Sequence, residues 1–113
     1  MLRCPAEALA QALRVLVDNS LDASDGPVVV TTLLRQGELV LQVRDAGPGM
    51  STDVLQRVFE PFFTTKPTGK GMGLGLFLAR NVATRLDGSL SLKSTPGVGT
   101  EAELTLPKSR LRT

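Results

Sequence analysis

The sequence predicts an α+β fold, a two-layer α/β sandwich with helices on one face of a mixed, mainly antiparallel sheet. Two helical apolar stripes and two pairs of alternating apolar segments support this class. With 113 residues, the chain can bury one core but is too short for two domains. We therefore expect a single domain over residues 1–113, with a basic tail at 108–113.

The first helix is predicted from Pro5 to about Ser24. Asn19 lies about 80° from the centre of its apolar stripe, so its carboxamide borders the core and could offer an oxygen to a hard cation such as Mg²⁺. A half-buried asparagine bonded to nearby backbone explains the same position equally well. The residues of the stripe are Leu9, Leu13, Leu16, Ser20 and Ala23.

Two hairpins are predicted from alternating or β-branched segments. The first joins a strand at 28–34 to a strand at 38–44, and the second joins 89–92 to 101–106 through a loop at 94–100. With the helices between and before them, these hairpins give the order helix, hairpin, short helix, helix, hairpin.

The first hairpin ends in Asp45, which is followed by Ala46-Gly47-Pro48-Gly49. A carboxylate at the end of a buried strand can accept a hydrogen bond from an exocyclic amine, and the glycines would let a ligand approach the turn. Aspartate also often closes a turn on its own backbone. Both interpretations of Asp45 stay open.

A short helix is predicted next, capped by Ser51 or Thr52 and ended by Pro61. Three of the chain's four phenylalanines lie within residues 59–63, and a polar stretch follows from Thr64 to Lys70. This segment is either an aromatic anchor for a loop or the hinge of a mobile lid.

Residues 71–76, Gly-Met-Gly-Leu-Gly-Leu, precede the last predicted helix, which stops at residues 87–88. Glycine lacks the Cβ that would keep an anion away from the backbone, and a helix N-terminus directs free N–H groups and a positive dipole end to the same place. A flexible helix entry is the simpler alternative. The expected apolar stripe is Leu74, Leu78, Val82 and Leu86.

The composition excludes several kinds of site. The chain has no histidine, so it cannot hold an imidazole general base or a histidine-rich metal site. Its single cysteine, Cys4, excludes an internal disulfide, and no signal peptide is recognisable, which fits a reducing, cytoplasmic setting. The net charge of +2 gives no indication of nucleic acid, so we expect no such partner.

Four segments, taken in chain order, resemble the boxes of the ATP-binding catalytic domain of two-component sensor histidine kinases, and a fifth matches the family's closing Gly-x-Gly-Thr. The superfamily also includes the gyrase, heat-shock chaperone and mismatch-repair ATPases. The resemblance covers about Ala6 to Pro107 and implies the Bergerat-type ATP-binding fold. The segments are 17–23 for the N box, 45–49 and 71–76 for the two glycine boxes, 59–62 for the F box, and 97–100 for the closing Gly-x-Gly-Thr.

The resemblance implies a site for ATP and Mg²⁺. Asn19 would be the catalytic metal ligand, Asp45 would accept the adenine amine, and Thr100 would support the adenine pocket. Gly47 and Gly49 would let the base enter. The phosphates would be bound by the second glycine box and neighbours on a lid, namely Thr65, Lys66, Lys70, Gly71, Gly73, Leu74, Gly75 and Leu76.

The implied activity is that of a transferase in two-component signal transduction, which donates the γ-phosphate of Mg-ATP to a histidine on a separate dimerisation and phosphoacceptor domain. Because this chain has no histidine, we expect a fragment of a longer kinase that does not autophosphorylate alone. The expected partners are that domain and, through it, a response regulator. We expect the isolated domain to be monomeric and the parent kinase to be a homodimer, cytoplasmic or anchored in the inner membrane.

The sequence departs from the family at three places. In the hydrolysing relatives, a glutamate that activates water stands four residues before the N-box asparagine, and histidine kinases commonly have a second asparagine there. Here the residue is Val15, which cannot deprotonate water and could weaken Mg²⁺ binding. Residues 86–88 are Leu-Asp-Gly where kinases often have His-Gly-Gly. The usual N-terminal strand is cut short at residues 1–5, so the sheet is expected to lack an edge or borrow one.

Three other functions remain as alternatives. The first is an ATP-hydrolysing conformational clamp of the gyrase or mismatch-repair type, which Val15 and the F box disfavour. The second is an anti-sigma serine kinase, which shares the fold but lacks this F box. The third is a degenerate interaction module that binds no nucleotide.

Overall fold

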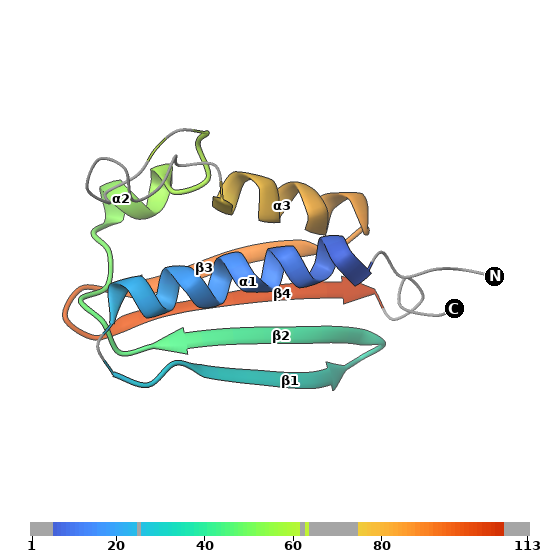
Figure 1. The fold of residues 1–113 in the computed structure, drawn as a ribbon, viewed down its shortest axis with the longest axis horizontal. Coiled ribbons are helices and arrows are strands. Elements are labelled where there is room, and N and C mark those ends of the chain that lie inside the picture. The colour runs from blue at the N-terminus through green and yellow to red at the C-terminus, as the bar shows by residue number, and fades with distance from the viewer. Residues whose placement is uncertain (1–5, 25, 62, 64–74, 108–113) are drawn as a thin grey trace.

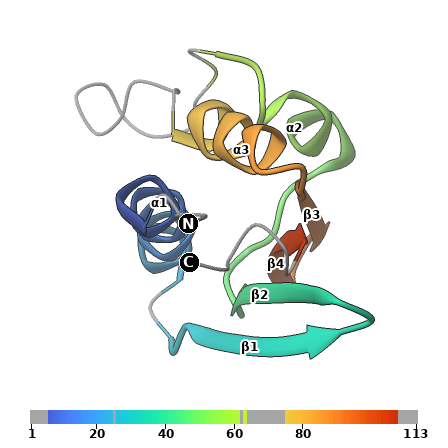
Figure 2. The ribbon, with the colours of Figure 1, turned by 90° about the vertical axis from the view of Figure 1, so that its right-hand side faces the viewer.

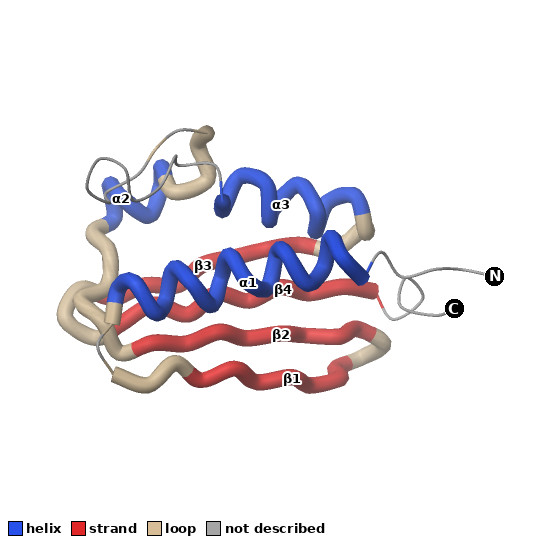
Figure 3. Tube along the Cα trace, in the orientation of Figure 1, coloured by secondary structure: helices blue, strands red, loops and turns tan. Residues whose placement is uncertain are grey.

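The computed structural model describes residues 6–24, 26–61, 63 and 75–107. Helices form one layer and the β-sheet forms the other (Figures 1, 2 and 3), which confirms the predicted two-layer sandwich. The predicted order of elements is also confirmed. The elements are α1 (Ala6–Ala23), β1 (Val29–Arg35), β2 (Glu38–Asp45), α2 (Thr52–Arg57), α3 (Gly75–Arg85), β3 (Ser89–Thr95) and β4 (Gly99–Pro107).

The four described strands lie in the order β1-β2-β4-β3, and every pairing among them is antiparallel. The parallel part of the expected mixed sheet is therefore not found in the described residues. Residues 1–5, where the sequence suggested a shortened strand, lie outside them. The pairing of β2 with β4 places Asp45 opposite Thr100, and the pairing of β3 with β4 places Ser94 opposite Thr100.

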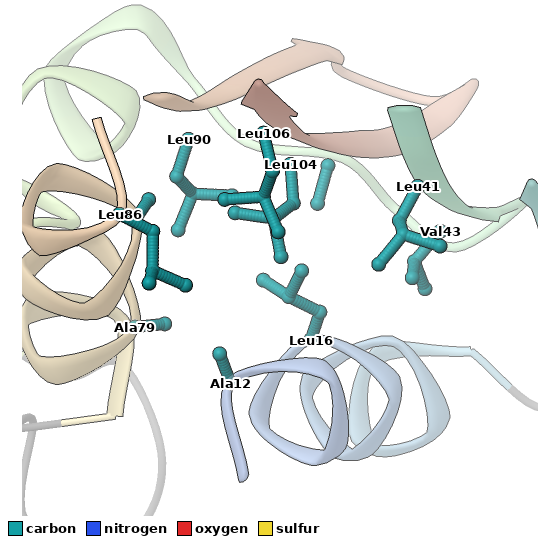
Figure 4. Packing of buried hydrophobic residues seen from close by; sticks show 11 residues of the cluster. Ala12, Leu16, Leu41, Val43, Ala79, Leu86, Leu90, Leu104 and Leu106 are labelled. Atoms are coloured by element: carbon teal, nitrogen blue, oxygen red, sulfur yellow. The ribbon is translucent and has the colours of Figure 1, made fainter. Parts of the chain in front are cut away.

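The hydrophobic core lies between the sheet and the helices α1 and α3 (Figure 4). The sheet contributes mainly large side chains, whereas α3 contributes two alanines. Small residues on a helix allow a close approach to its neighbours, so α1 and α3 pack together above the central strands. The core residues are Ala12, Leu16, Leu41, Val43, Ala79, Ala83, Leu86, Leu90, Ala102, Leu104 and Leu106.

Two expected stripe positions are wrong, and a third is outside the described residues. Ala23 is exposed at the last turn of α1, and Leu78 is 52% exposed on α3. The buried face of α3 instead contains Ala79 and Ala83, because this helix packs close to α1 through small side chains and turns its larger leucine outward. Leu74 lies outside the described residues.

The second hairpin is longer than predicted. The expected loop at 94–100 shrinks to residues 96–98, because Ser94 pairs with Thr100 and Thr95 pairs with Gly99. The Val98 N–H donates to the Thr95 carbonyl (3.0 Å), and Gly97 has φ +79°, which closes the turn. Because of this extension, the pairing of β3 with β4 reaches Thr100, the residue that pairs with Asp45 of β2.

The predicted N-cap of α2 and the predicted stop after α3 are confirmed, whereas α2 ends at Arg57 and not at Pro61. Ser51 is the N-cap of α2, and its hydroxyl accepts from the Val54 N–H (3.3 Å). After α3, the Gly88 N–H donates to the Ala83 carbonyl (2.8 Å) and the Asp87 N–H to the Thr84 carbonyl (3.0 Å). These are the two bonds of a Schellman motif, in which Asp87, with φ +60°, holds the left-handed position usually taken by glycine.

Gly88 is required by packing. A Cβ at this position would lie 2.0 Å from the Thr105 carbonyl oxygen of β4 and 2.8 Å from Leu106 Cδ2. The turn between α3 and β3 therefore lies directly against the backbone of the central strand.

We predict that Gly88→Ala lowers the free energy of unfolding by about 1–3 kcal/mol, because the added methyl group forces β4 and the turn apart. The measurement is urea denaturation followed by circular dichroism. Gly26→Ala is the matched control, since its new Cβ would meet only Ser24 Oγ at 3.6 Å in an exposed loop. If both variants changed stability by less than about 0.5 kcal/mol, the close packing at Gly88 would be disproved.

Candidate functional site

Asp45 is the last residue of β2. Its side chain is on the face of the sheet that packs against the helices, and the residue is 7% exposed. Its Oδ1 accepts hydrogen bonds from the Gly47 N–H (2.9 Å) and the Thr100 N–H (3.3 Å). Both of these donors bind Oδ1, and among the described residues no donor to Oδ2 is found, so closing the turn uses only one carboxylate oxygen. The two interpretations of Asp45 are thus compatible: one oxygen closes the turn and the other can accept from a ligand.

The inward-facing positions of three neighbouring strands change from apolar to polar at the same end of the sheet. On β2 the series is Leu41, Val43, Asp45, and on β3 it is Leu90, Leu92, Ser94. On β4, Thr100 precedes the buried Ala102, Leu104 and Leu106. Because Asp45, Thr100 and Ser94 are paired in register, their side chains form one polar cluster beside the core.

Ser94 is the member of this cluster that sequence reasoning missed. Its Oγ accepts from the Met50 N–H (2.7 Å) and lies 2.9 Å from Thr100 Oγ1 and 3.1 Å from the Gly99 carbonyl oxygen. The sequence signal that could have identified it is a serine at an inward-facing position of an alternating strand, where the pattern would otherwise require an apolar residue.

The turn after Asp45 is in close backbone contact with two other segments. A Cβ at Gly47 would lie 2.6 Å from the Ala23 carbonyl oxygen, at the end of α1, and one at Gly49 would lie 2.2 Å from the Thr95 carbonyl oxygen. The Gly97 N–H donates to the Pro48 carbonyl (2.7 Å). Both glycines therefore have a packing role, whether or not they also admit a base.

Asn19 is half-buried on α1, one turn before Ala23, which contacts Gly47. The C-terminal part of α1 and the turn after β2 therefore lie at the same end of the molecule, at the left in Figure 1. The two interpretations of the Asn19 carboxamide, metal ligand or backbone partner, both stay predictions.

The start of α3 meets α1 at Val15, one helical turn before Asn19. A Cβ at Gly75 would lie 3.0 Å from Val15 Cγ1, so the valine side chain packs directly on the glycine backbone. The side chain of Leu76 is partly buried and packs against the core. The remaining expected phosphate-binding residues lie outside the described part of the chain: Thr65, Lys66, Lys70, Gly71, Gly73 and Leu74.

Two arginines lie over phenylalanines of the segment 59–63, of which Phe59 belongs to the predicted F box. The Arg80 guanidinium of α3 lies over the Phe59 ring, 4.7 Å from its centroid, and Arg57 of α2 lies 4.6 Å from the centroid of Phe63. Arg57 also pairs with Glu60 (3.2 Å). Phe59 packs against the core, which favours the aromatic-anchor interpretation for this residue; the polar stretch proposed as a lid lies outside the described residues.

Two further features limit the chemistry of the described residues. Histidine, cysteine, aspartate and glutamate form no group of three or more suited to a metal ion among them. In the same part of the chain, no helix has the length and hydropathy needed to span a bilayer.

Comparison with known proteins confirms the resemblance. Residues 5–110 match the family model described as histidine kinase-, DNA gyrase B-, and HSP90-like ATPase. The sensor histidine kinase GtrS of Pseudomonas aeruginosa is 38% identical over 106 residues, which are 94% of this chain and 20% of GtrS. The sensor histidine kinase YkoH of Bacillus subtilis is 34% identical over 105 residues, 88% of this chain and 23% of YkoH. The chain thus spans less than a quarter of either relative.

Solved structures give the same result. The catalytic domain of the histidine kinase ThkA superposes with a TM-score of 0.82 and 26% identity over 93% of this chain and 69% of that one. Full-length ShkA in complex with AMPPNP superposes with a TM-score of 0.79 and 27% identity, over 88% of this chain and 21% of ShkA. The chain therefore belongs to the histidine kinase-, DNA gyrase B- and HSP90-like ATPase family, and its relatives named here are sensor histidine kinases.

Proposed function

We propose that this chain is the catalytic domain of a sensor histidine kinase, which binds Mg-ATP and donates the γ-phosphate to a histidine on a separate dimerisation and phosphoacceptor domain. The observation that carries the proposal is the Asp45 carboxylate at the end of a buried strand, where two backbone N–H groups bind Oδ1 and no donor to Oδ2 is found among the described residues. The AMPPNP bound to ShkA, which has the same fold, supports a nucleotide as the ligand.

The adenine end of the nucleotide would be recognised by Asp45. A carboxylate oxygen accepts from the adenine amine, whereas guanine presents an acceptor oxygen at the corresponding position and would be repelled. Thr100 lies beside Asp45 and donates its N–H to Oδ1, which keeps the carboxylate oriented. Gly47 and Gly49 would let the base approach the turn.

The phosphate end would lie between α1 and the start of α3. Backbone N–H groups at Gly75 and in the preceding residues, including Gly71 and Gly73, would donate to phosphate oxygens, aided by the positive end of the α3 dipole. Thr65, Lys66 and Lys70 would add donors and positive charge.

Asn19 is the residue that would hold Mg²⁺. Its half-buried carboxamide is a single hard oxygen ligand, and the described residues offer no group of acidic side chains for the ion. This suits Mg²⁺, which keeps several waters and is commonly bound by one or two protein ligands together with substrate phosphates. When bound, the ion neutralises charge on the phosphate oxygens.

Transfer is favoured over hydrolysis because Val15 packs its methyl groups against Gly75, where a water-activating base would be needed. In transfer, a histidine nitrogen attacks the γ-phosphorus, the bond to the β-phosphate oxygen breaks and ADP leaves. This reaction needs positioning and charge neutralisation more than covalent chemistry by the domain. We propose that the phosphate passes on to a response regulator and that the parent kinase is homodimeric.

We predict that Asp45→Asn weakens ATP binding by about 1.5–3 kcal/mol, roughly 10-fold to 150-fold, because a charge-assisted hydrogen bond to the amine is lost. The asparagine keeps an oxygen for Gly47 and Thr100, so the fold should persist. Isothermal titration calorimetry measures the affinity. Asp53→Asn, at an exposed position of α2, is the control, and unchanged affinity in Asp45→Asn would remove Asp45 from the site.

We predict that Asn19→Ala lowers the affinity for ATP in the presence of Mg²⁺ and has little effect in EDTA, because only the metal contact is lost. The same titration is run in both buffers. Asn81→Ala, at an exposed position of α3, is the control. An equal loss in EDTA would mean that Asn19 supports the fold and does not bind the metal.

We predict that the 113-residue chain does not label itself with the γ-phosphate of radiolabelled ATP but transfers it to a histidine on an added phosphoacceptor domain of a sensor kinase. Acid-labile, base-stable phosphate on the added domain is the expected product. Stable labelling of the chain itself would contradict the prediction. Appreciable ATP hydrolysis with nucleotide-dependent dimerisation would favour the conformational clamp instead.

A further inference from the structure

We propose that Ser94 is a positioning residue of this site, which fixes the Thr100 hydroxyl and the turn after β2 and so contributes to the choice of purine base. The proposal rests on the proposed nucleotide site. It adds to that site a residue that does not itself contact the base but positions Thr100, which does.

The Ser94 hydroxyl joins three segments of the chain. It accepts from the Met50 N–H of the turn after β2 (2.7 Å) and lies 3.1 Å from the Gly99 carbonyl oxygen and 2.9 Å from Thr100 Oγ1 on β4. Ser94 is also paired with Thr100 across β3 and β4. A half-buried hydroxyl with three polar contacts therefore sits at the point where the turn meets the second hairpin.

The chemistry of these contacts restricts where the protons can lie. The Met50 N–H can only donate and the Gly99 carbonyl can only accept. The single Ser94 proton therefore goes either to Gly99 or to Thr100. In the first arrangement, Thr100 donates to Ser94 and offers only lone pairs to a ligand. In the second arrangement, Thr100 accepts from Ser94, and its own proton is available to a ligand.

The second arrangement matches adenine. The amine of this base donates a hydrogen bond, and the ring nitrogen next to it accepts one. The protein must therefore offer an acceptor opposite the amine and a donor opposite the ring nitrogen. Asp45 Oδ2 supplies the acceptor, and Thr100, oriented by Ser94, supplies the donor directly or through a water. Hypoxanthine has a carbonyl oxygen and a ring N–H at these two positions, so it presents the opposite pattern. With its proton directed to Thr100, Ser94 therefore helps the site to distinguish ATP from inosine triphosphate.

Ser94 also affects Asp45 through the backbone. The Thr100 N–H donates to Asp45 Oδ1 (3.3 Å). The turn after β2 begins at Asp45, whose Oδ1 also accepts from the Gly47 N–H, and the same turn is bound to Ser94 through the Met50 N–H. Loss of the Ser94 hydroxyl would leave the Met50 N–H without its acceptor and the Thr100 hydroxyl without its partner.

The test compares Ser94→Val with Ser94→Thr, which have nearly the same shape and both suit a strand, but only threonine keeps the hydroxyl. Calorimetry gives the affinities for ATP and inosine triphosphate with Mg²⁺. We expect Ser94→Val to reduce the ratio of the two affinities by about threefold to tenfold, and Ser94→Thr to keep it. Ser91→Val, at an exposed position of the same strand, is the control. Amide exchange at Met50 should be faster in Ser94→Val.

A double-mutant cycle tests whether Ser94 acts through Thr100. If it does, Ser94→Val combined with Thr100→Val should lose clearly less discrimination than the sum of the two single losses, because only the part that passes through the Met50 turn adds to the loss in Thr100→Val. Additive losses would overturn the proposal. If Ser94→Val does not fold, Ser94→Ala, which adds no volume, replaces it in both measurements.

The outcomes separate this proposal from the function on which it rests. If the unmodified chain prefers ATP and the folded Ser94 variant keeps the full preference, only the role of Ser94 is wrong. If the unmodified chain binds neither nucleotide, or both equally, the adenine site at Asp45 is wrong and the role of Ser94 fails with it.

Discussion

The antiparallel pairing of β2 with β4 is the constraint on which the rest of the structure depends. These central strands present Leu41, Leu104 and Leu106 to the helices, and their register sets Asp45 opposite Thr100. A shift by one residue would turn every inward side chain to the other face and would separate these two polar groups. The same hydrophobic burial that stabilises the sheet therefore fixes the geometry of the candidate site.

Close backbone contact is the second condition for this geometry. Gly49 approaches Thr95, and a Cβ at Gly99 would lie 2.1 Å from the Asp45 carbonyl oxygen, so neither position has room for a side chain. Gly49 and Gly99 thus allow the ends of the two hairpins to pack closely together, in addition to any contact that they make with a base. A substitution at one of them would displace Asp45 and would combine a loss of stability with a loss of binding.

The sequence predicted the element order and the sandwich, because apolar periodicity reports which face of an element is buried. It failed where packing distance decided the outcome: Leu78 is exposed on α3 because alanines face α1. For Asp45, local reasoning offered two interpretations, and only the geometry of Oδ1 and Oδ2 makes them compatible. Ser94 was missed because its partners, Met50 and Thr100, come from other segments of the chain. No local sequence pattern determines how these segments align with β3.

The contact between Val15 and Gly75 bears on the choice between transfer and hydrolysis. Val15 lies one turn from Asn19, so with the phosphates at the start of α3, as proposed, its methyl groups form an apolar wall next to them. Such a wall neither orients nor deprotonates water. A site of this kind would protect the γ-phosphate from water until a nucleophile positioned by another domain arrives.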